Sequence, residues 1–490
     1  MARCHRRWRR ALICVCGPCI CLVLLFLSLG IMVCSNMNNA ASQAASHSMH
    51  SPQSDHFVAY RRFKDMDLTS IPKTFWKLHE EALWNQLQLA IDRHLNPILN
   101  PQNAHRRFKS RASYDSLLRR SFSQVTDLDP TRRKLEQLPQ QMRDFVSHMK
   151  RRNYPVLIQS PNATCGAGAV NEKEPPLLLL SVKSTQMNFQ NRQAIRQTWG
   201  RVGWVATHRM NGGLRQQVGG YIRRVFLIGK EYTRDSAWNV SELLQMEDQQ
   251  YGDILQWDFE DTFFNLTLKD VLFWKWFAHH CGQIRFVFKG DDDVFVNTPN
   301  LINYLHDQLE KPHADRTMNE FMVGDVIAAA FPNRVHQSKY FVPDSFYEGL
   351  YPTYAGGGGV VYSGQLAKRL HKISGRVHLF PIDDVFVGMC MTRLNAHPIH
   401  HPGFLTFDFR GDEEKEPCAY HTILLVHKRN PTQLIELWDE LSKTRSQCLY
   451  GPLRISDKNI STSSLLALDG NNVDTKTGSK YKVYKHEKKN

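Results

Sequence analysis

The chain has 490 residues, a net charge of +15 and 42% hydrophobic residues, enough for one large domain or two or three average ones with ample core. No nucleic-acid recognition motif occurs and the basic residues are spread along the chain, which argues against nucleic acid as the partner. Anionic small ligands, sulfated or sialylated partners or a membrane surface would explain the charge equally well.

The N-terminus combines a basic segment with an apolar one. Arginines crowd residues 1–10, and residues 11–34 contain no charged side chain. A helix over residues 11–34 would be about 36 Å long, enough to cross a bilayer with some tilt. No Lys or Arg follows until Arg61, so we expect a type II signal anchor with residues 1–10 in the cytosol. A cleaved signal peptide is the alternative, but its apolar region is usually only about 7 to 15 residues.

Residues 35–150 are predicted to form a lumenal stem. Residues 35–54 are rich in Ser, Ala, Asn, Gln and His, which indicates a flexible segment. Residues 75–99 have apolar residues at helical spacing and two tryptophans, so we expect a helix that docks on the following domain. A core helix is predicted at 138–149. At the other end of the chain, residues 449–490 are polar and lysine-rich, which predicts a disordered tail.

Residues 151–448 are predicted to form the main domain, in which apolar strands alternate with helices. The predicted strands cover 177–182, 225–228, 254–259 and 286–288, and the predicted helices cover 191–199, 240–249 and 266–280. This alternation indicates an α/β fold with a mostly parallel sheet flanked by helices on both faces.

Three consecutive aspartates, Asp291, Asp292 and Asp293, follow the apolar strand at 286–288. Ligands of open α/β sheets bind at the carboxyl ends of strands. Carboxylates this close repel one another unless a positive charge lies among them, and a hard divalent cation that also holds phosphates would supply it. A solvated turn is the alternative, but a second apolar run at 294–296 argues against an exposed acidic loop. The triplet therefore predicts a site for metal and nucleotide.

Two further features are consistent with a nucleotide site. Lys183 ends a predicted strand, and Arg192 and Arg196 lie one turn apart on the next helix, which suits phosphates but also a solvated helix face. Four glycines at 356–359 allow a ligand to approach the backbone. They match neither a Walker loop nor the Rossmann spacing.

A second pair of acids, Asp383 and Asp384, begins an apolar helix. Acids at a helix N-terminus can simply cap it or interact favourably with its dipole. In a chain that already carries a metal-type acid triplet, one of the two could instead serve as a general base.

The lumenal cysteines contain no CxxC pair, so disulfides are expected rather than zinc. We expect Cys390 to pair with Cys418, because the first follows Asp384 on a helix and the second opens the next strand. Closing this loop of roughly 28 residues would stabilise the domain by about 3 to 4 kcal/mol. A second expected pair is Cys165 with Cys281.

Sequons predict N-glycosylation at Asn162, Asn239 and Asn459. A further sequon at Asn265 opens an apolar helix, where the side chain could act as a cap instead.

Several long motifs in order give the chain a family resemblance. It resembles the inverting β1,3-glycosyltransferases of the Golgi, most closely the UDP-GlcNAc:βGal β1,3-N-acetylglucosaminyltransferases that extend poly-N-acetyllactosamine. The matching motifs are RQAIRQTWG (192–200), YGDILQWDFEDTFFNLTLK (251–269), FVFKGDDDVFVN (286–297), VGDV (323–326), YAGGGG (354–359), PIDDVFVGMC (381–390) and EPCAYHTILLVHKRNP (416–431).

The resemblance implies a GT-A type fold, a UDP-GlcNAc donor, Mn²⁺ or Mg²⁺, and a single displacement with inversion. It implies that the metal is bound by Asp291, Asp293 and His427, with Asp293 the direct ligand. It assigns the general base to Asp384, which leaves Asp383 to cap the helix or to bind the acceptor. The donor-binding residues that it implies are Lys183, Arg192, Asp291, Asp292, Gly357 and Gly358.

These features allow three functions. The first is transfer of N-acetylglucosamine to galactose-terminated glycans at the Golgi membrane. The second is β1,3-galactosyl transfer, although galactosyl relatives tend to have Glu-Asp-Val where this chain has Asp383-Asp384-Val385. The third is a non-catalytic glycan-binding protein, against which the intact acid motifs argue. The sequence leaves open which glycan carries the galactose and whether the chain forms homo- or hetero-oligomers.

Overall fold

A computed structural model describes part of the chain, and all of that part belongs to one compact unit comprising residues 57–490. The described residues are 82–98, 136–159, 175–211, 214–231, 240–328, 330–448 and 452–454. None of the helices within them is both long and apolar enough to cross a membrane. The predicted anchor at 11–34 lies outside them.

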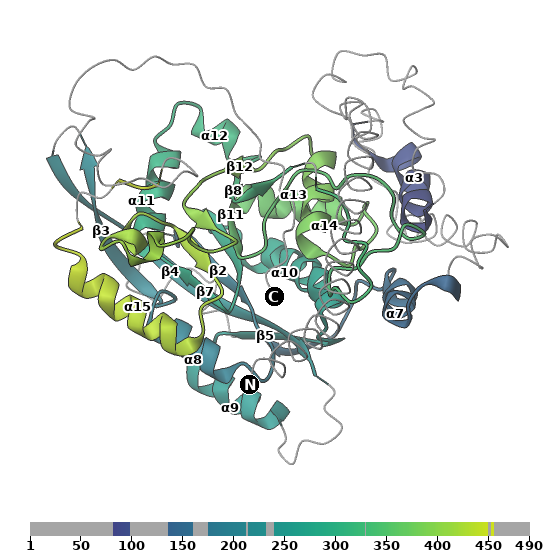
Figure 1. The fold of residues 1–490 in the computed structure, drawn as a ribbon, viewed down its shortest axis with the longest axis horizontal. Helices are drawn as coiled ribbons and strands as arrows, with labels where there is room; N and C mark the ends of the chain where they lie inside the picture. Colours follow the sequence, from purple (N-terminus) through teal and green to yellow (C-terminus); the bar gives the residue numbers. More distant parts are fainter. Residues whose placement is uncertain are drawn as a thin grey trace, which may run out of the picture. The chain divides into compact units, whose positions relative to one another are not determined.

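The centre of the unit is a nine-stranded sheet (Figure 1). Its strands, in spatial order, are β1 (Val156–Gln159), β5 (Ile254–Glu260), β4 (Leu214–Lys230), β2 (Leu178–Lys183), β6 (Phe286–Asp291), β11 (Gly359–Ser363), β8 (Met322–Gly324) and β12 (Ile399–His400), while β3 (Gly203–Asn211) pairs with β4. The four strands β5, β4, β2 and β6 are parallel, as predicted for the core of the sheet. β1, β3 and β11 run antiparallel to their neighbours, so the complete sheet is mixed.

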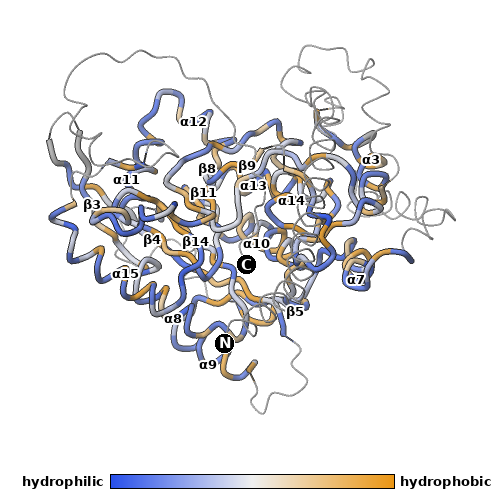
Figure 2. The backbone as a smooth tube through the Cα atoms, in the orientation of Figure 1, coloured by the Kyte–Doolittle hydropathy of each residue, from blue (hydrophilic) through white to orange (hydrophobic). Residues whose placement is uncertain are grey.

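Successive residues of a strand point to opposite faces of the sheet, so both faces carry apolar side chains. Helices cover each face. Leu179 packs into one hydrophobic cluster, whereas Leu178 and Leu180 pack into the other. The first cluster includes α3 (Leu83–Leu95), α7 (Gln140–His148), α10 (Leu266–His280), α13 (Gly364–Ser374) and α14 (Asp383–Arg393). The second includes α8 (Phe189–Gln197), α9 (Val240–Tyr251), α11 (Thr298–Leu309) and α15 (Pro431–Thr444). Figure 2 shows hydrophobic segments, in orange, in the interior beside β11 and β14.

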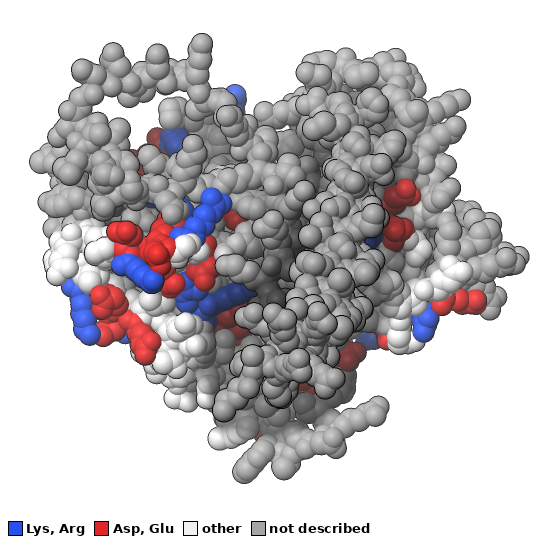
Figure 3. Space-filling view, viewed as in Figure 1, with Lys and Arg blue, Asp and Glu red and all other residues white. Residues whose placement is uncertain are grey.

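A second, three-stranded sheet lies beside the acid triplet. It consists of β13 (Phe404–Leu405), β14 (Leu425–His427) and β7 (Val294–Val296), and β7 begins directly after Asp293. The remaining elements are β9 (Val326–Ile327), β10 (Tyr354–Ala355), α12 (Ala314–Thr317) and the 3₁₀ turns η5 (Phe263–Asn265), η6 (Glu413–Lys415) and η7 (Ala419–His421). On the face shown in Figure 3, acidic and basic side chains of the described residues are interspersed.

A hydrogen bond and an ion pair hold helix α3 on the main domain. The Trp84 indole donates to the carbonyl of Leu379 at 3.0 Å. Asp92 forms a buried ion pair with Arg393 of α14 at 2.6 Å. Because buried ion pairs are costly to break, α3 belongs to the folded core rather than to a free linker.

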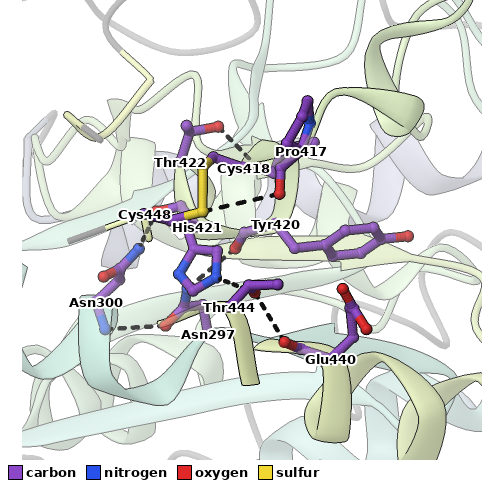
Figure 4. The surroundings of a disulfide bond; sticks show 11 residues. Asn297, Asn300, Pro417, Cys418, Tyr420, His421, Thr422, Glu440, Thr444 and Cys448 are labelled. Carbon is purple, nitrogen blue, oxygen red and sulfur yellow. Dashed lines mark hydrogen bonds between the residues drawn. A yellow bond between two sulfur atoms is a disulfide. The ribbon is translucent and has the colours of Figure 1, made fainter. Parts of the chain in front are cut away.

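The predicted disulfide between Cys390 and Cys418 is wrong. Cys418 is bonded to Cys448, with 5.6 Å between their Cα atoms (Figure 4). Cys390 is a free thiol inside α14, and burial raises its pKa to about 12. Sequence spacing could not reveal that the side chain of Cys390 points into the apolar core while the end of α15 returns to Cys418. Cys281 is also disulfide-bonded, and its partner lies outside the described residues, as does Cys165.

The packed chain extends past the predicted start of the tail at residue 449. The backbone N–H of Arg454 donates to the carbonyl of Thr422 at 2.7 Å, and the buried Arg454 guanidinium pairs with Glu413. Arg454, within the predicted tail, is therefore packed against the domain. Other residues of the predicted tail lie outside the described part.

Candidate active site

The site forms where β2 and β6 end side by side. These strands are parallel, and Lys183, the last residue of β2, is in register with Asp291, the last residue of β6. β11 runs beside β6 in the opposite direction, so the glycine run enters the same edge, where the N–H of Asp291 donates to the carbonyl of Gly358. The carboxyl edge of the sheet thus gathers the acids, the lysine and the glycines predicted for the site.

The structure brings together the three residues expected to bind metal. β14 pairs antiparallel with β7, which sets His427 opposite Val294. The His427 Nε2 lies 3.2 Å from the Asp293 Oδ1 and 3.9 Å from the Asp291 Oδ2. One ligand atom from each of these residues lies within 4.8 Å of the other two. We call this group the metal triad.

The donors of the metal triad fit a divalent cation. Carboxylate oxygens suit Mg²⁺ and Mn²⁺, and an imidazole nitrogen is compatible with a transition metal. Burial raises the pKa of Asp291 to about 7, with Lys183 opposing the shift and the neighbouring Asp383 and Asp293 adding to it. A cation among these carboxylates would relieve that repulsion.

Beside the metal triad lies a buried group of two lysines and three aspartates, which we call the lysine–aspartate cluster. Lys183 Nζ is 3.1 Å from Asp270 of α10 and also contacts Asp383 of α14. Lys289 Nζ lies 3.3 Å from Asp270, 3.5 Å from Asp383 and 3.2 Å from Asp384. The cluster therefore ties the ends of two strands to two helices on one face of the sheet.

The two neighbouring acids of α14 differ in their affinity for a proton. Although burial disfavours its charge, Lys183 and Lys289 hold the pKa of Asp383 below its usual value. Burial and the charge of Asp383 raise the pKa of Asp384 to about 6, against the opposing effect of Lys289. Asp383 stays charged between the lysines, so Asp384 is the acid suited to accept a proton near neutral pH.

The glycine run leaves room for Asp384 and for the metal triad. A Cβ on Gly357 would lie 2.8 Å from the Asp384 Oδ2, and a Cβ on Gly358 would lie 3.0 Å from the His427 Cβ. A larger residue at either position would displace a side chain of the site. These glycines thus lie between Asp384 and the metal triad, where a donor-binding role was predicted for them.

Arg192 does not occupy the position predicted for a nucleotide ligand. Its side chain is completely buried and forms a bidentate ion pair with Glu247, with N–O distances of 2.9 and 2.7 Å. Its remaining donors bond the Ser184 hydroxyl and the carbonyls of Thr185 and Gln186. Arg192 therefore shapes the loop after β2 and has no donor left for a ligand.

Asp292 likewise points into the protein. It is buried and accepts hydrogen bonds from the Ser184 hydroxyl at 2.6 Å and the Asn188 amide at 2.9 Å. The Lys269 ammonium donates to the Ser184 carbonyl at 2.5 Å. The middle acid of the triplet thus fixes the loop, while its neighbours on either side join the metal triad.

Two residues of the site, Lys289 and Asp270, were missed in the sequence. Lys289 comes two residues before Asp291 and therefore lies on the same face of β6, a signal that strand periodicity could have supplied. Asp270 is a charged residue in a helix that is buried along most of its length. A buried charge needs a partner, but the sequence could not say which.

One of the four sequon asparagines, Asn265, lies within the described residues. Asn162, Asn239 and Asn459 lie outside the described residues. Asn265 directly precedes α10, but its side chain makes no capping bond and donates instead to the carbonyl of Glu260.

Comparisons with known proteins identify the family of the chain. Residues 190–402 match the galactosyltransferase family. A mouse protein named N-acetyllactosaminide beta-1,3-N-acetylglucosaminyltransferase 2 is 41% identical over 77% of this chain and 89% of its own length. Its human counterpart is 40% identical over the same shares. A rat protein named UDP-GlcNAc:betaGal beta-1,3-N-acetylglucosaminyltransferase 7 is 40% identical over 62% of this chain and 72% of its own length.

Proposed function

The chain belongs to the galactosyltransferase family and is a glycosyltransferase, and we propose that it transfers N-acetylglucosamine from UDP-GlcNAc in β1,3 linkage to terminal galactose of glycans. The names of its relatives support this donor and this acceptor. The product would extend poly-N-acetyllactosamine. The observation that carries the proposal is the metal triad next to an acid, Asp384, whose pKa lies near 6.

In the proposed reaction Asp384 removes the proton from the acceptor 3-hydroxyl. The resulting oxygen forms a bond to C1 of the donor sugar as the bond from C1 to the diphosphate breaks, which inverts the configuration at C1. The proton remains on Asp384 and UDP leaves. A divalent cation held by the metal triad would supply positive charge to the departing diphosphate.

Asp383 has a different part in this proposal. Its ion pairs with Lys183 and Lys289 fix the first turn of α14, and so aim the neighbouring carboxylate of Asp384. Its negative charge also raises the proton affinity of Asp384. Acceptor binding by Asp383 remains a proposal, as do donor contacts by Lys183, Gly357 and Gly358.

We also propose a Golgi location, with residues 11–34 as a type II anchor and N-glycans at Asn162, Asn239 and Asn459. The basic N-terminus and the uncharged segment after it support this orientation. Endoglycosidase treatment should increase the mobility of the protein on a gel. An unshifted band, together with an N-terminus protected from protease in intact vesicles, would reject the orientation.

A donor screen tests the proposed activity. The purified chain, with Mn²⁺ and an N-acetyllactosamine acceptor, should form product from UDP-GlcNAc and little from UDP-galactose. The family description makes galactosyl transfer the alternative. Product from UDP-galactose alone would select that alternative, and acceptor binding without turnover of any UDP-sugar would instead favour a glycan-binding protein.

A further inference from the structure

The histidine of the metal triad is held by the chain that follows β13. β13 pairs parallel with β14, with Leu405 beside Val426, so the next residue, Thr406, lies alongside His427. The His427 Nδ1 is 3.3 Å from the carbonyl oxygen of Thr406. A carbonyl can only accept a hydrogen bond, so Nδ1 carries the hydrogen and Nε2 of the neutral ring keeps a lone pair. Nε2 is the atom that faces the two aspartates of the metal triad.

A bidentate ion pair closes the turn that follows Thr406. The Arg429 guanidinium donates to the Asp408 carboxylate through Nη2 at 2.7 Å and through Nη1 at 3.2 Å. Arg429 keeps only 4% of its side chain exposed, and its Nη2 is also 3.0 Å from Glu414. Because a two-point contact fixes orientation as well as distance, Asp408 is held in one position beside the end of β14.

Arg429 also contacts the main chain at two members of the metal triad. Its backbone N–H donates to the carbonyl of Asp293 at 2.7 Å. Its Nη1 donates to the carbonyl of His427 at 3.1 Å. One buried arginine thus joins two metal-triad residues to the turn at Asp408.

The backbone of this region adopts conformations that need support from their surroundings. Asp408 has a φ of 76° and Lys428 a φ of 65°, in the left-handed region that residues other than glycine rarely occupy. Such residues persist where surrounding contacts fix them, and they cluster at functional sites. Asp408 is fixed by the ion pair with Arg429 and by the N–H of Phe409, which donates to its carboxylate at 2.8 Å. Loss of the ion pair would free the turn that places the Thr406 carbonyl.

We propose that Asp408 and Arg429 are positioning residues for the metal triad. Their ion pair fixes the turn that presents the Thr406 carbonyl to Nδ1 of His427, and so keeps Nε2 directed toward the two aspartates. Groups that orient a metal-binding histidine raise the affinity of the site for its metal. The inference rests on the divalent cation of the proposed function and identifies what preforms its site.

The test measures the binding of Mn²⁺ alone to the full-length chain and its variants by calorimetry. Asp408→Asn should raise the Kd for Mn²⁺ about 10- to 100-fold, the usual effect of losing a group that orients a ligand. Asparagine tolerates a positive φ, so this change removes the carboxylate charge without straining the turn. Arg429→Lys keeps the positive charge but loses the two-point contact, and should raise the Kd in the same direction.

Glu413→Gln is the matched control. Like Asp408, Glu413 is the acid partner of a buried arginine, but that arginine, Arg454, bonds the chain at Thr422 and not at the metal triad. This variant should leave the Kd for Mn²⁺ unchanged. Urea denaturation shows whether each variant is folded. Excess Mn²⁺ should restore most of the activity of Asp408→Asn, because the ligands and Asp384 are unaltered.

An unchanged Kd in either Asp408→Asn or Arg429→Lys would overturn the inference and leave the proposed metal dependence intact. An equal rise in Glu413→Gln would also overturn it, because the effect would then be one of charge or general stability. Activity of Asp408→Asn that stays low at saturating Mn²⁺ would do the same. If the unmodified chain binds no Mn²⁺, the metal dependence of the proposed function fails, and this inference fails with it.

Discussion

The metal triad and the lysine–aspartate cluster use the same kind of side chain in opposite environments. Asp293 keeps 43% of its side chain exposed and has a histidine as its near partner. Asp270 keeps 1% of its side chain exposed and lies between two lysines. Carboxylates of the first kind can take a cation from solution, whereas those of the second kind are neutralised by the protein itself.

This difference explains how acids so close together can have separate roles. The open pair, Asp291 and Asp293, remains available to an external ion. The closed pair, Asp383 and Asp384, is arranged by internal lysines, so that one acid stays charged and the other gains proton affinity. Pairs of titratable groups whose pKa values are pushed apart are typical of acid–base sites.

The largest expected effect comes from changing a residue of the open pair. Asp293→Ala should abolish turnover, because the cation would lose a charged ligand. The same change should leave the midpoint of unfolding nearly unchanged, since the side chain is partly exposed. Activity assays with Mn²⁺, with and without a chelator, together with urea denaturation, test both expectations. Near-normal activity of the unmodified chain in chelator would exclude a role for metal.

Within the closed pair, Asp384→Asn should lower kcat by about 10² to 10⁴, the usual effect of losing one well-placed base. UDP binding should remain nearly intact, because the substitution leaves the metal triad unaltered. Asp383→Asn should have a smaller effect on kcat. Wild-type turnover in Asp384→Asn, or a greater loss in Asp383→Asn at equal folding, would contradict the assignment of the base.

The third prediction concerns stability. Asp270→Asn should lower the free energy of unfolding by about 3 to 5 kcal/mol, because two buried lysines lose a shared partner. Asp412→Asn provides a matched control, since Asp412 pairs with Lys415 at the exposed surface. Breaking an exposed pair should change stability by about 1 kcal/mol or less. Equal unfolding midpoints for the two variants would contradict the contrast between buried and open acids.

The smallest expected effect is a shift in the pH dependence of kcat/KM. With Asp384 as base, kcat/KM should fall about tenfold per unit as the pH drops below about 6, where this carboxylate takes up a proton. Asp383→Asn removes the negative neighbour and should move this acid limb to lower pH. An acid limb that stays in place in Asp383→Asn at saturating Mn²⁺ would show that another group controls it.

Local sequence determined much of this protein. The alternation of apolar strands and helices predicted the parallel centre of the sheet, and α10 runs over the predicted residues, Leu266–His280. The acid triplet was correctly expected at the end of a strand, and the second acid pair at the start of a helix. Such features depend on neighbours within a few residues, so periodicity and turn chemistry are sufficient to reveal them.

Tertiary structure alone decided which distant groups meet. The pairing of β14 with β7 brings His427 to Asp293, although the family resemblance had already named that histidine. The Arg192 side chain is buried because it forms an ion pair with Glu247 of α9. Cys418 is bonded to Cys448 because the chain after α15 returns to Cys418. A buried charge or thiol takes whichever partner the packing of the elements supplies, and a linear pattern of residue types does not contain that choice.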